Sequence, residues 1–310
     1  MGLNTLIASY RSSFWLNEKK WLIMAAYILR TNEIWLHTIP FHSINSEKAE
    51  VRFELSSMEN SFRLVTRPIS TILESDSNLT FTTLELGYNH TGPRGAKQLV
   101  DALRKNKTLT TLCFNYNQLG PEGTHYIADF LKDNTTLTIL DLGDNEIGDL
   151  GAKYLADALK KNTSLINFDV KRNGIGNLGT QHLVNVLKNN MTLTTLYLTF
   201  NQIEDLGTQY LANALQNNKT LSLLDLANNG IRDEGALYLS HVLKNNTTLT
   251  TLSLTSNHIQ DIGIQYLADS LQNNTTLTKL NLGKTCIETD AKQYLQDLLK
   301  RNNELNRHKQ

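Results

Sequence analysis

Apolar and polar positions repeat along this chain at a fixed interval of 28 residues between positions 79 and 302. Residues 139–147 are one copy, with leucines at 140 and 142, an asparagine at 145 and an isoleucine at 147. The asparagine recurs in seven copies, and threonine replaces it in the eighth: Asn89, Asn117, Asn145, Asn173, Asn201, Asn229, Asn257 and Thr285. A fixed period of this size predicts a solenoid of eight stacked units.

Each copy begins with alternating apolar side chains, which predict a parallel β-strand with one buried face. The clearest inward pairs are Leu112 and Phe114, Leu140 and Leu142, Phe168 and Val170, Leu196 and Leu198, Leu224 and Leu226, and Leu252 and Leu254. The recurring asparagine follows, where the chain leaves the strand. Its side chain is expected to bond backbone groups of neighbouring turns.

The second half of each copy predicts a loop and then a helix. An apolar residue is expected to fill the loop: Leu119, Ile147, Ile175, Ile203, Ile231, Ile259 and Ile287. A glycine then indicates a tight turn into the helix: Gly95, Gly123, Gly151, Gly179, Gly207, Gly235 and Gly263. In the third copy Tyr154, Leu155, Ala158 and Leu159 form a stripe of helical period that faces the sheet. The predicted fold is an α/β solenoid (horseshoe), with strands on the concave face, helices on the convex face and a cap at each end.

Residues 1–50 lie outside the repeat and contain all three tryptophans, Trp15, Trp21 and Trp35. Residues 14–23 predict a hairpin, and an N-capped helix from Asn17 to position 29 is an equal alternative. We expect this aromatic segment to dock on the first repeat as a cap. Residues 51–78 have the pattern of a degenerate capping repeat, and residues 303–310 form a polar tail.

Charge and cysteine content restrict the class of protein. Lys plus Arg and Asp plus Glu each number 30, so no basic excess favours nucleic acid or an anionic membrane. Cys113 and Cys286 lie six predicted strands apart, about 29 Å, which is too far for a disulfide bond. The apolar run 21–29 is too short to span a membrane and lacks a signal-peptide cleavage site. We therefore expect a cytoplasmic location.

Glycosylation sequons also recur every 28 residues, at Asn78, Asn106, Asn134, Asn162, Asn190, Asn218, Asn246 and Asn274. In a secreted protein they would accept glycans. Their regular spacing favours a structural role instead, because asparagine tolerates the left-handed conformation that ends a helix.

Signatures of independent catalysis are missing from the sequence. It contains no G-x-x-x-x-G-K-[ST] nucleotide-binding run, and its eight histidines do not cluster at metal-binding spacing. The acidic positions Asp141, Asp169 and Asp225 are interrupted by Tyr197, and no Ser-His or Cys-His pairing accompanies them. We expect neither an enzyme nor a cofactor.

The 28-residue unit with its L-x-L-x-x-N-x-I-x-x-x-G core resembles the ribonuclease-inhibitor class of leucine-rich repeats. That class is also found in the repeat arrays of NOD-like receptors and of Ran GTPase-activating proteins. The resemblance covers residues 79–302 and implies binding of a protein ligand on the concave face, in innate sensing or regulatory signalling. The expected state is a monomer that binds neither nucleic acid nor membrane.

Outward-pointing residues near the middle of the predicted sheet suggest where the partner binds. They combine exposed aromatic side chains with arginine and aspartate, the residue types that dominate interface energies. The predicted partner-binding residues are Asp141, Asp144, Asp169, Lys171, Arg172, Tyr197, Phe200 and Asp225.

Two alternatives remain open from the residues. The first is GTPase activation of the Ran-directed type, although those relatives carry an acidic C-terminal tail and residues 301–310 are basic. The second is a substrate adaptor of a ubiquitin ligase, in which residues 1–50 would dock a partner.

Overall fold

A computed structural model describes residues 50–52, 82–283 and 289–307. All of them belong to the second of the chain's two units, Phe41–Gln310. The predictions for the tryptophan-rich segment, for most of 51–78 and for Thr285 and Ile287 fall outside the described residues.

Within the described residues, nine parallel strands pair in sequence order into one open sheet. They are β1 (Glu50–Arg52), β2 (Thr83–Glu85), β3 (Thr111–Cys113), β4 (Ile139–Asp141), β5 (Asn167–Asp169), β6 (Thr195–Tyr197), β7 (Leu223–Asp225), β8 (Thr251–Ser253) and β9 (Lys279–Asn281). From β2 onward the register advances by the 28-residue repeat, so that Leu84, Leu112 and Leu140 lie side by side. At β1 the offset is 33 residues, because Val51 pairs with Leu84.

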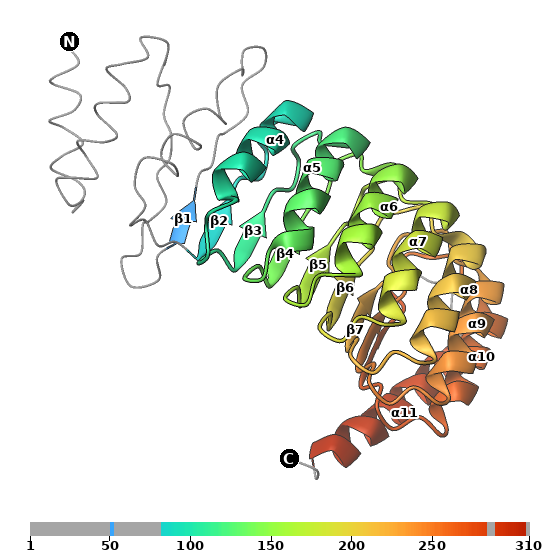
Figure 1. Ribbon diagram of the computed structural model, residues 1–310. Coiled ribbons are helices and arrows are strands. Elements are labelled where there is room, and N and C mark those ends of the chain that lie inside the picture. Colours follow the sequence, from blue (N-terminus) through green and yellow to red (C-terminus); the bar gives the residue numbers. More distant parts are fainter. Residues whose placement is uncertain (1–49, 53–81, 284–288, 308–310) are drawn as a thin grey trace, which may run out of the picture. The chain divides into compact units, whose positions relative to one another are not determined.

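A helix follows each strand from β2 onward, and these helices together cover one face of the sheet (Figure 1). The helices are α4 (Gly92–Leu103), α5 (Gly120–Asp133), α6 (Gly148–Leu159), α7 (Asn177–Leu187), α8 (Glu204–Leu215), α9 (Asp233–Leu243), α10 (Asp261–Leu271) and α11 (Thr289–Arg307). The strands line the inner side of the curve that these repeats describe. This arrangement confirms the predicted α/β leucine-rich-repeat solenoid. Helix α11 continues past position 302, where the sequence pattern of the repeats ends.

The core lies between the sheet and the helices, as the alternation predicted. All six inward strand pairs are buried, and so are the loop residues from Leu119 to Ile259. On α6 the predicted stripe is buried at Leu155, Ala158 and Leu159, while Tyr154 is half-buried against the core.

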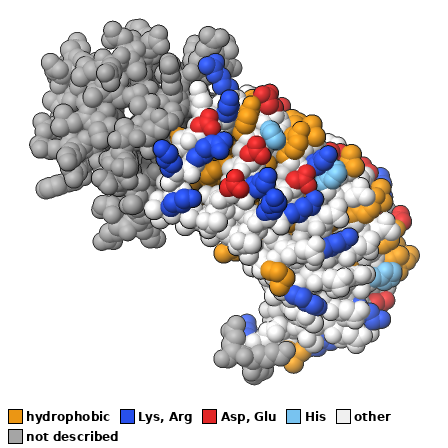
Figure 2. Space-filling model, viewed as in Figure 1, with side chains coloured by type: hydrophobic (Ala, Val, Ile, Leu, Met, Phe, Trp, Pro, Cys, Tyr) orange, Lys and Arg blue, Asp and Glu red, His pale blue; other side chains and the backbone are white. Residues whose placement is uncertain are grey.

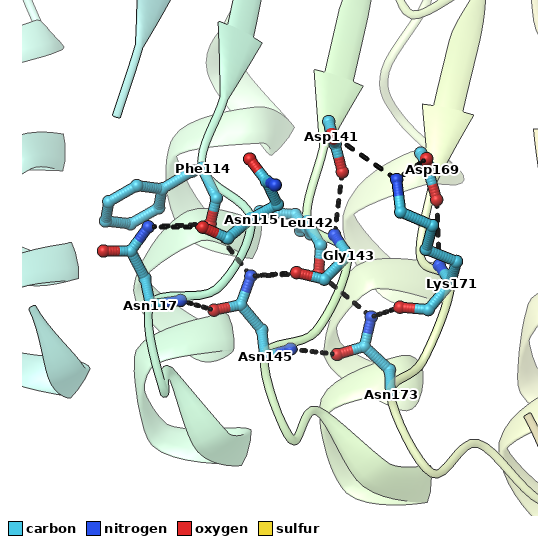
Figure 3. A network of polar contacts seen from close by, with 10 residues as sticks. All are labelled: Phe114, Asn115, Asn117, Asp141, Leu142, Gly143, Asn145, Asp169, Lys171 and Asn173. Carbon is cyan, nitrogen blue, oxygen red and sulfur yellow. Dashed lines mark hydrogen bonds and ion pairs between the residues drawn. The ribbon is translucent and has the colours of Figure 1, made fainter. Parts of the chain in front are cut away.

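The recurring asparagines form a ladder that we call the turn ladder, shown in Figure 3. Asn145 is fully buried. Its Oδ1 accepts the backbone N–H of Asn117 at 2.8 Å, and its Nδ2 donates to the carbonyls of Phe114, Leu142 and Gly143 at 2.9, 3.0 and 3.2 Å. The predicted bonding between neighbouring turns is confirmed.

The sequon asparagines have a structural role, but the predicted left-handed conformation is wrong. Asn134 is extended, with φ −80° and ψ 130°, and none of the described sequon asparagines has a positive φ. Asn162 shows the actual role. Its Nδ2 donates to the carbonyls of Leu131 and Asn134 in the preceding repeat, at 2.8 and 3.0 Å, and its Oδ1 accepts the N–H of Leu165 at 2.8 Å. These side chains form a second, helix-end ladder, because the carbonyls at a helix C-terminus need donors from outside the helix.

The recurring glycines lie within the first turn of each helix, and their role is close packing between repeats. A Cβ at Gly179 would lie 2.5 Å from Asp149 Oδ1. That same oxygen accepts the N–H groups of Gly176 and Gly179, at 2.8 and 2.9 Å. Asp149 therefore caps the helix of the next repeat, a contact that the sequence pattern did not predict.

Charged side chains of both signs are interspersed on the face seen in Figure 2. This mixture agrees with equal numbers of acidic and basic residues in the chain. In the part of the chain that the structure describes, no helix has the length and apolar character needed to cross a membrane.

Candidate functional site

The predicted partner-binding residues, which we call the strand patch, lie on four neighbouring strands and the turns that follow them. Asp141 on β4 pairs in register with Asp169 on β5, and Tyr197 on β6 pairs with Asp225 on β7. Since parallel strands lie about 4.8 Å apart, these four side chains span about 15 Å. The other members of the strand patch are Asp144, Lys171, Arg172 and Phe200, which lie just beyond the strand ends.

Three aspartates of the strand patch stabilise their own turns. Asp141 Oδ1 accepts the N–H of Gly143 at 2.8 Å, and Asp169 Oδ1 accepts the N–H of Lys171 at 2.9 Å. Asp225 Oδ1 likewise accepts a backbone N–H, that of Ala227, at 3.0 Å. One oxygen of each carboxylate is thus used by the fold.

Lys171 lies between two of these carboxylates (Figure 3). Its Nζ is 2.8 Å from Asp169 Oδ2 and 3.8 Å from Asp141 Oδ2. The aliphatic part of its side chain passes over Gly143, where a Cβ would approach Lys171 Cγ to 2.9 Å. The glycine provides the space for this position of the lysine.

Burial and charge act differently on the two partners. Burial raises the pKa of Asp141, and it outweighs the N–H of Gly143 and the more distant ammonium of Lys171. Burial also acts to lower the pKa of Lys171, but the hydrogen bond to Asp169 and the nearby carboxylates raise it overall. The lysine is therefore held in its charged form, whereas the charge on Asp141 is disfavoured by its surroundings.

The residues just before the turn ladder share a left-handed backbone, with φ between 52° and 63°. We call them the turn column: Tyr88, Tyr116, Asp144, Arg172, Phe200, Asn228 and Ser256. Glycine, asparagine and aspartate occupy this conformation most easily, and other residues adopt it at a cost of about 1–2 kcal/mol. Four repeats nevertheless place a tyrosine, an arginine or a phenylalanine there.

Two bulky members of the turn column contact each other directly. The guanidinium carbon of Arg172 lies 3.9 Å from the ring centroid of Phe200, and Phe200 remains 43% exposed. A cation over an aromatic face is a favourable contact. The pair presents a flat, partly apolar and positively charged surface to solvent.

Sequence reasoning missed a second aromatic pair in the same column. The rings of Tyr88 and Tyr116 stack at 4.2 Å with an interplanar angle of 13°, and Tyr88 is 58% exposed. Both tyrosines stand one position before a ladder asparagine, as Arg172 and Phe200 do. That shared position was the signal available in the sequence, but only the four central repeats were included in the prediction.

Among the residues that the structure describes, no group of three or more His, Cys, Asp or Glu side chains is arranged to hold a metal ion. The described surface offers carboxylates, cations and exposed rings in a row across the strands. Its chemistry suits recognition of another molecule by contact.

A protein-family model described as "Leucine Rich repeat" matches six segments of the chain. They are residues 105–128, 133–156, 189–212, 217–240, 245–268 and 273–291. These segments are similar to leucine-rich repeats. The match agrees with the strand, loop and helix that each 28-residue unit forms in the structure.

The solved structures that are similar to this chain include the following two. Leiomodin-1 actin-binding site 2 is 26% identical, with a TM-score of 0.47, over 50% of this chain and 90% of that one. The tropomodulin C-terminal domain from Caenorhabditis elegans is 12% identical, with a TM-score of 0.36, over 69% of this chain and 96% of that one. No curated protein sequence matches the chain.

Proposed function

We propose that this leucine-rich-repeat protein is a non-catalytic scaffold that binds a protein partner through the strand patch on the concave face. The observation that carries the proposal is the exposed pair of Arg172 and Phe200 in the turn column. Arginine and aromatic residues are enriched among the side chains that contribute most to interface energies. Here both occupy a backbone conformation that favours smaller residues.

The surroundings of this pair support the same conclusion. Tyr197 and Asp225 extend the surface across the next two strands, and Lys171 is fixed by its two carboxylates. A surface whose side chains are already held loses little conformational entropy on binding, which favours affinity. The proposal includes a monomeric scaffold, so that each chain presents one such surface.

The test compares two double variants after a partner has been identified by affinity capture and purified. Arg172→Ala with Phe200→Ala removes the central pair. Asp157→Ala with Lys160→Ala removes an exposed ion pair at the C-terminal end of α6 and serves as the matched control. Circular dichroism verifies that both variants fold, and calorimetry measures the dissociation constant.

We expect the Arg172 and Phe200 variant to weaken binding by about 30-fold, equivalent to ~2 kcal/mol. The α6 control should bind as the wild type does. Unchanged affinity in the folded Arg172 and Phe200 variant would show that the partner binds elsewhere and would refute the proposal.

A further inference from the structure

We infer that the Tyr88–Tyr116 stack and the Asp144 carboxylate form a binding site for an arginine side chain of a protein partner. This inference rests on the proposed function, because the site continues the same face toward the N-terminal repeats. It adds the chemistry of the group that the partner presents.

Asp144 has an unsatisfied oxygen. Its Oδ2 is buried and has no hydrogen-bond partner within the described ranges. Burial raises the pKa of Asp144 and outweighs both the hydrogen bond between its carboxylate and the Tyr116 side chain and the positive charge of Arg172. A buried acceptor without a partner carries a free-energy cost, which a donor supplied by another molecule would remove.

The molecule itself shows how an arginine fits the turn column. The guanidinium carbon of Arg172 lies over the ring of Phe200, its neighbour in the next repeat, 3.9 Å from the ring centroid. The Tyr88–Tyr116 half of the column has an equivalent aromatic surface and an adjacent carboxylate but no arginine. An external guanidinium would complete this half in the way that Arg172 completes the other.

The local charge balance also favours a cation. From β2 to β7 the outward strand and turn positions carry five carboxylates and two cations: Glu85, Asp141, Asp144, Asp169 and Asp225 against Lys171 and Arg172. Lys171 is already paired with Asp169 and Asp141. Arg172 lies against Phe200, and no ion pair joins it to Asp144 in the described part of the chain.

The geometry favours arginine over lysine. Turns of adjacent repeats lie about 5 Å apart, so one planar guanidinium is able to contact the Tyr116 ring and still reach the Asp144 carboxylate. Its donors lie in a rigid fork suited to carboxylate oxygens, and its plane stacks on aromatic rings. An ammonium group is a compact, strongly hydrated charge that makes only one of these contacts well.

The test uses the full chain with carbon-13 in its tyrosine rings, and the tripeptide acetyl-Gly-Arg-Gly-amide as the probe. We expect saturable shifts of the Tyr88 and Tyr116 ring signals at millimolar peptide. The lysine tripeptide should bind at least about threefold more weakly.

Asp144→Asn should weaken binding of the arginine tripeptide by about fivefold. Asparagine tolerates the left-handed conformation, so this variant is expected to fold. Asp157→Asn is the matched control, because it removes an exposed carboxylate on α6 that lies outside the strand patch and the two rings, and the affinity for the arginine tripeptide should not change.

The inference is overturned if the two ring signals do not shift, if the lysine tripeptide binds equally well, or if both asparagine variants behave alike. These failures are distinguishable from failure of the proposed function. Suppose that the partner binds the Arg172→Ala, Phe200→Ala variant more weakly but binds Asp144→Asn as tightly as the wild type. That result would support the proposed scaffold function and refute only the arginine site.

Discussion

Replacing Asn145 with alanine removes an amide that joins two repeats in the middle of the turn ladder. The side chain is fully buried, accepts one hydrogen bond and donates three. The main loss is the acceptor for the buried N–H of Asn117. An unsatisfied buried donor costs about 1–3 kcal/mol.

The three carbonyls that Asn145 contacts lose less, because each keeps another donor. Phe114 O retains Nδ2 of Asn117 at 3.1 Å, and Leu142 O retains Nδ2 of Asn173 at 3.0 Å. Gly143 O keeps the N–H of Tyr116 at 2.9 Å. The net contribution of one hydrogen bond to stability is about 0.5 kcal/mol at its lower end. With the three carbonyl losses counted at that value, Asn145→Ala should lower the free energy of unfolding by about 3 kcal/mol in total.

Asn89 provides the matched comparison at the N-terminal end of the same ladder. Its Nδ2 donates to Leu86 O and Gly87 O at 2.7 and 3.0 Å, and its Oδ1 has no partner among the described residues. Asn89→Ala therefore leaves no described N–H without an acceptor. We expect it to lower the free energy of unfolding by only about 1 kcal/mol.

Urea unfolding, followed by far-ultraviolet circular dichroism, measures the stability of both variants. The shift of each unfolding midpoint shows which variant is destabilised more. Hydrogen exchange of the Asn117 amide supplies a local readout, because only Asn145→Ala removes its acceptor. Equal destabilisation by the two substitutions, or unchanged protection of the Asn117 amide, would refute the assignment of the cost to that N–H.

Two further predictions concern Asp141 and the packing glycines. Because the folded-state pKa of Asp141 is raised, its contribution to stability is present at low pH and is lost as pH rises above about 3.8. Asp141→Asn keeps an oxygen that accepts the N–H of Gly143. Urea midpoints should therefore show that the variant is as stable as the wild type or more stable at pH 7, and that it gains no stability at pH 3.5. A clear loss of stability at pH 7 would contradict this prediction. Gly179→Ala should lower the thermal midpoint through a clash worth about 2 kcal/mol, since its Cβ would lie 2.5 Å from Asp149 Oδ1. Gly176→Ala, whose Cβ would lie 3.5 Å from the same atom, is the control and should be nearly neutral; similar losses in both would disprove the packing role.

The repeat pattern was sufficient to predict the fold. Leu140 and Leu142 alternate in the sequence and are buried in the structure, and Asn145 bonds the adjacent turns as its position indicated. Each interior repeat has the same neighbours, so a strand, loop and helix that bury one face locally also bury it throughout the stack. For the site, the repeat register predicts Asp141, Asp169, Tyr197 and Asp225 on adjacent strands, and the structure pairs them in that order.

Apart from the turn ladder, the side-chain contacts between repeats were decided only by the tertiary structure. The sequon asparagine Asn162 donates to a carbonyl 31 residues earlier, and Asp149 caps a helix 27 to 30 residues later. In the site, the bridge from Lys171 to Asp141 and the stack of Tyr88 on Tyr116 depend on side-chain reach across neighbouring turns. A periodic sequence specifies which residues recur at the same place, because burial acts on each repeat alike. Which of those residues touch depends on the distance and direction between repeats, and these exist only once the repeats are stacked.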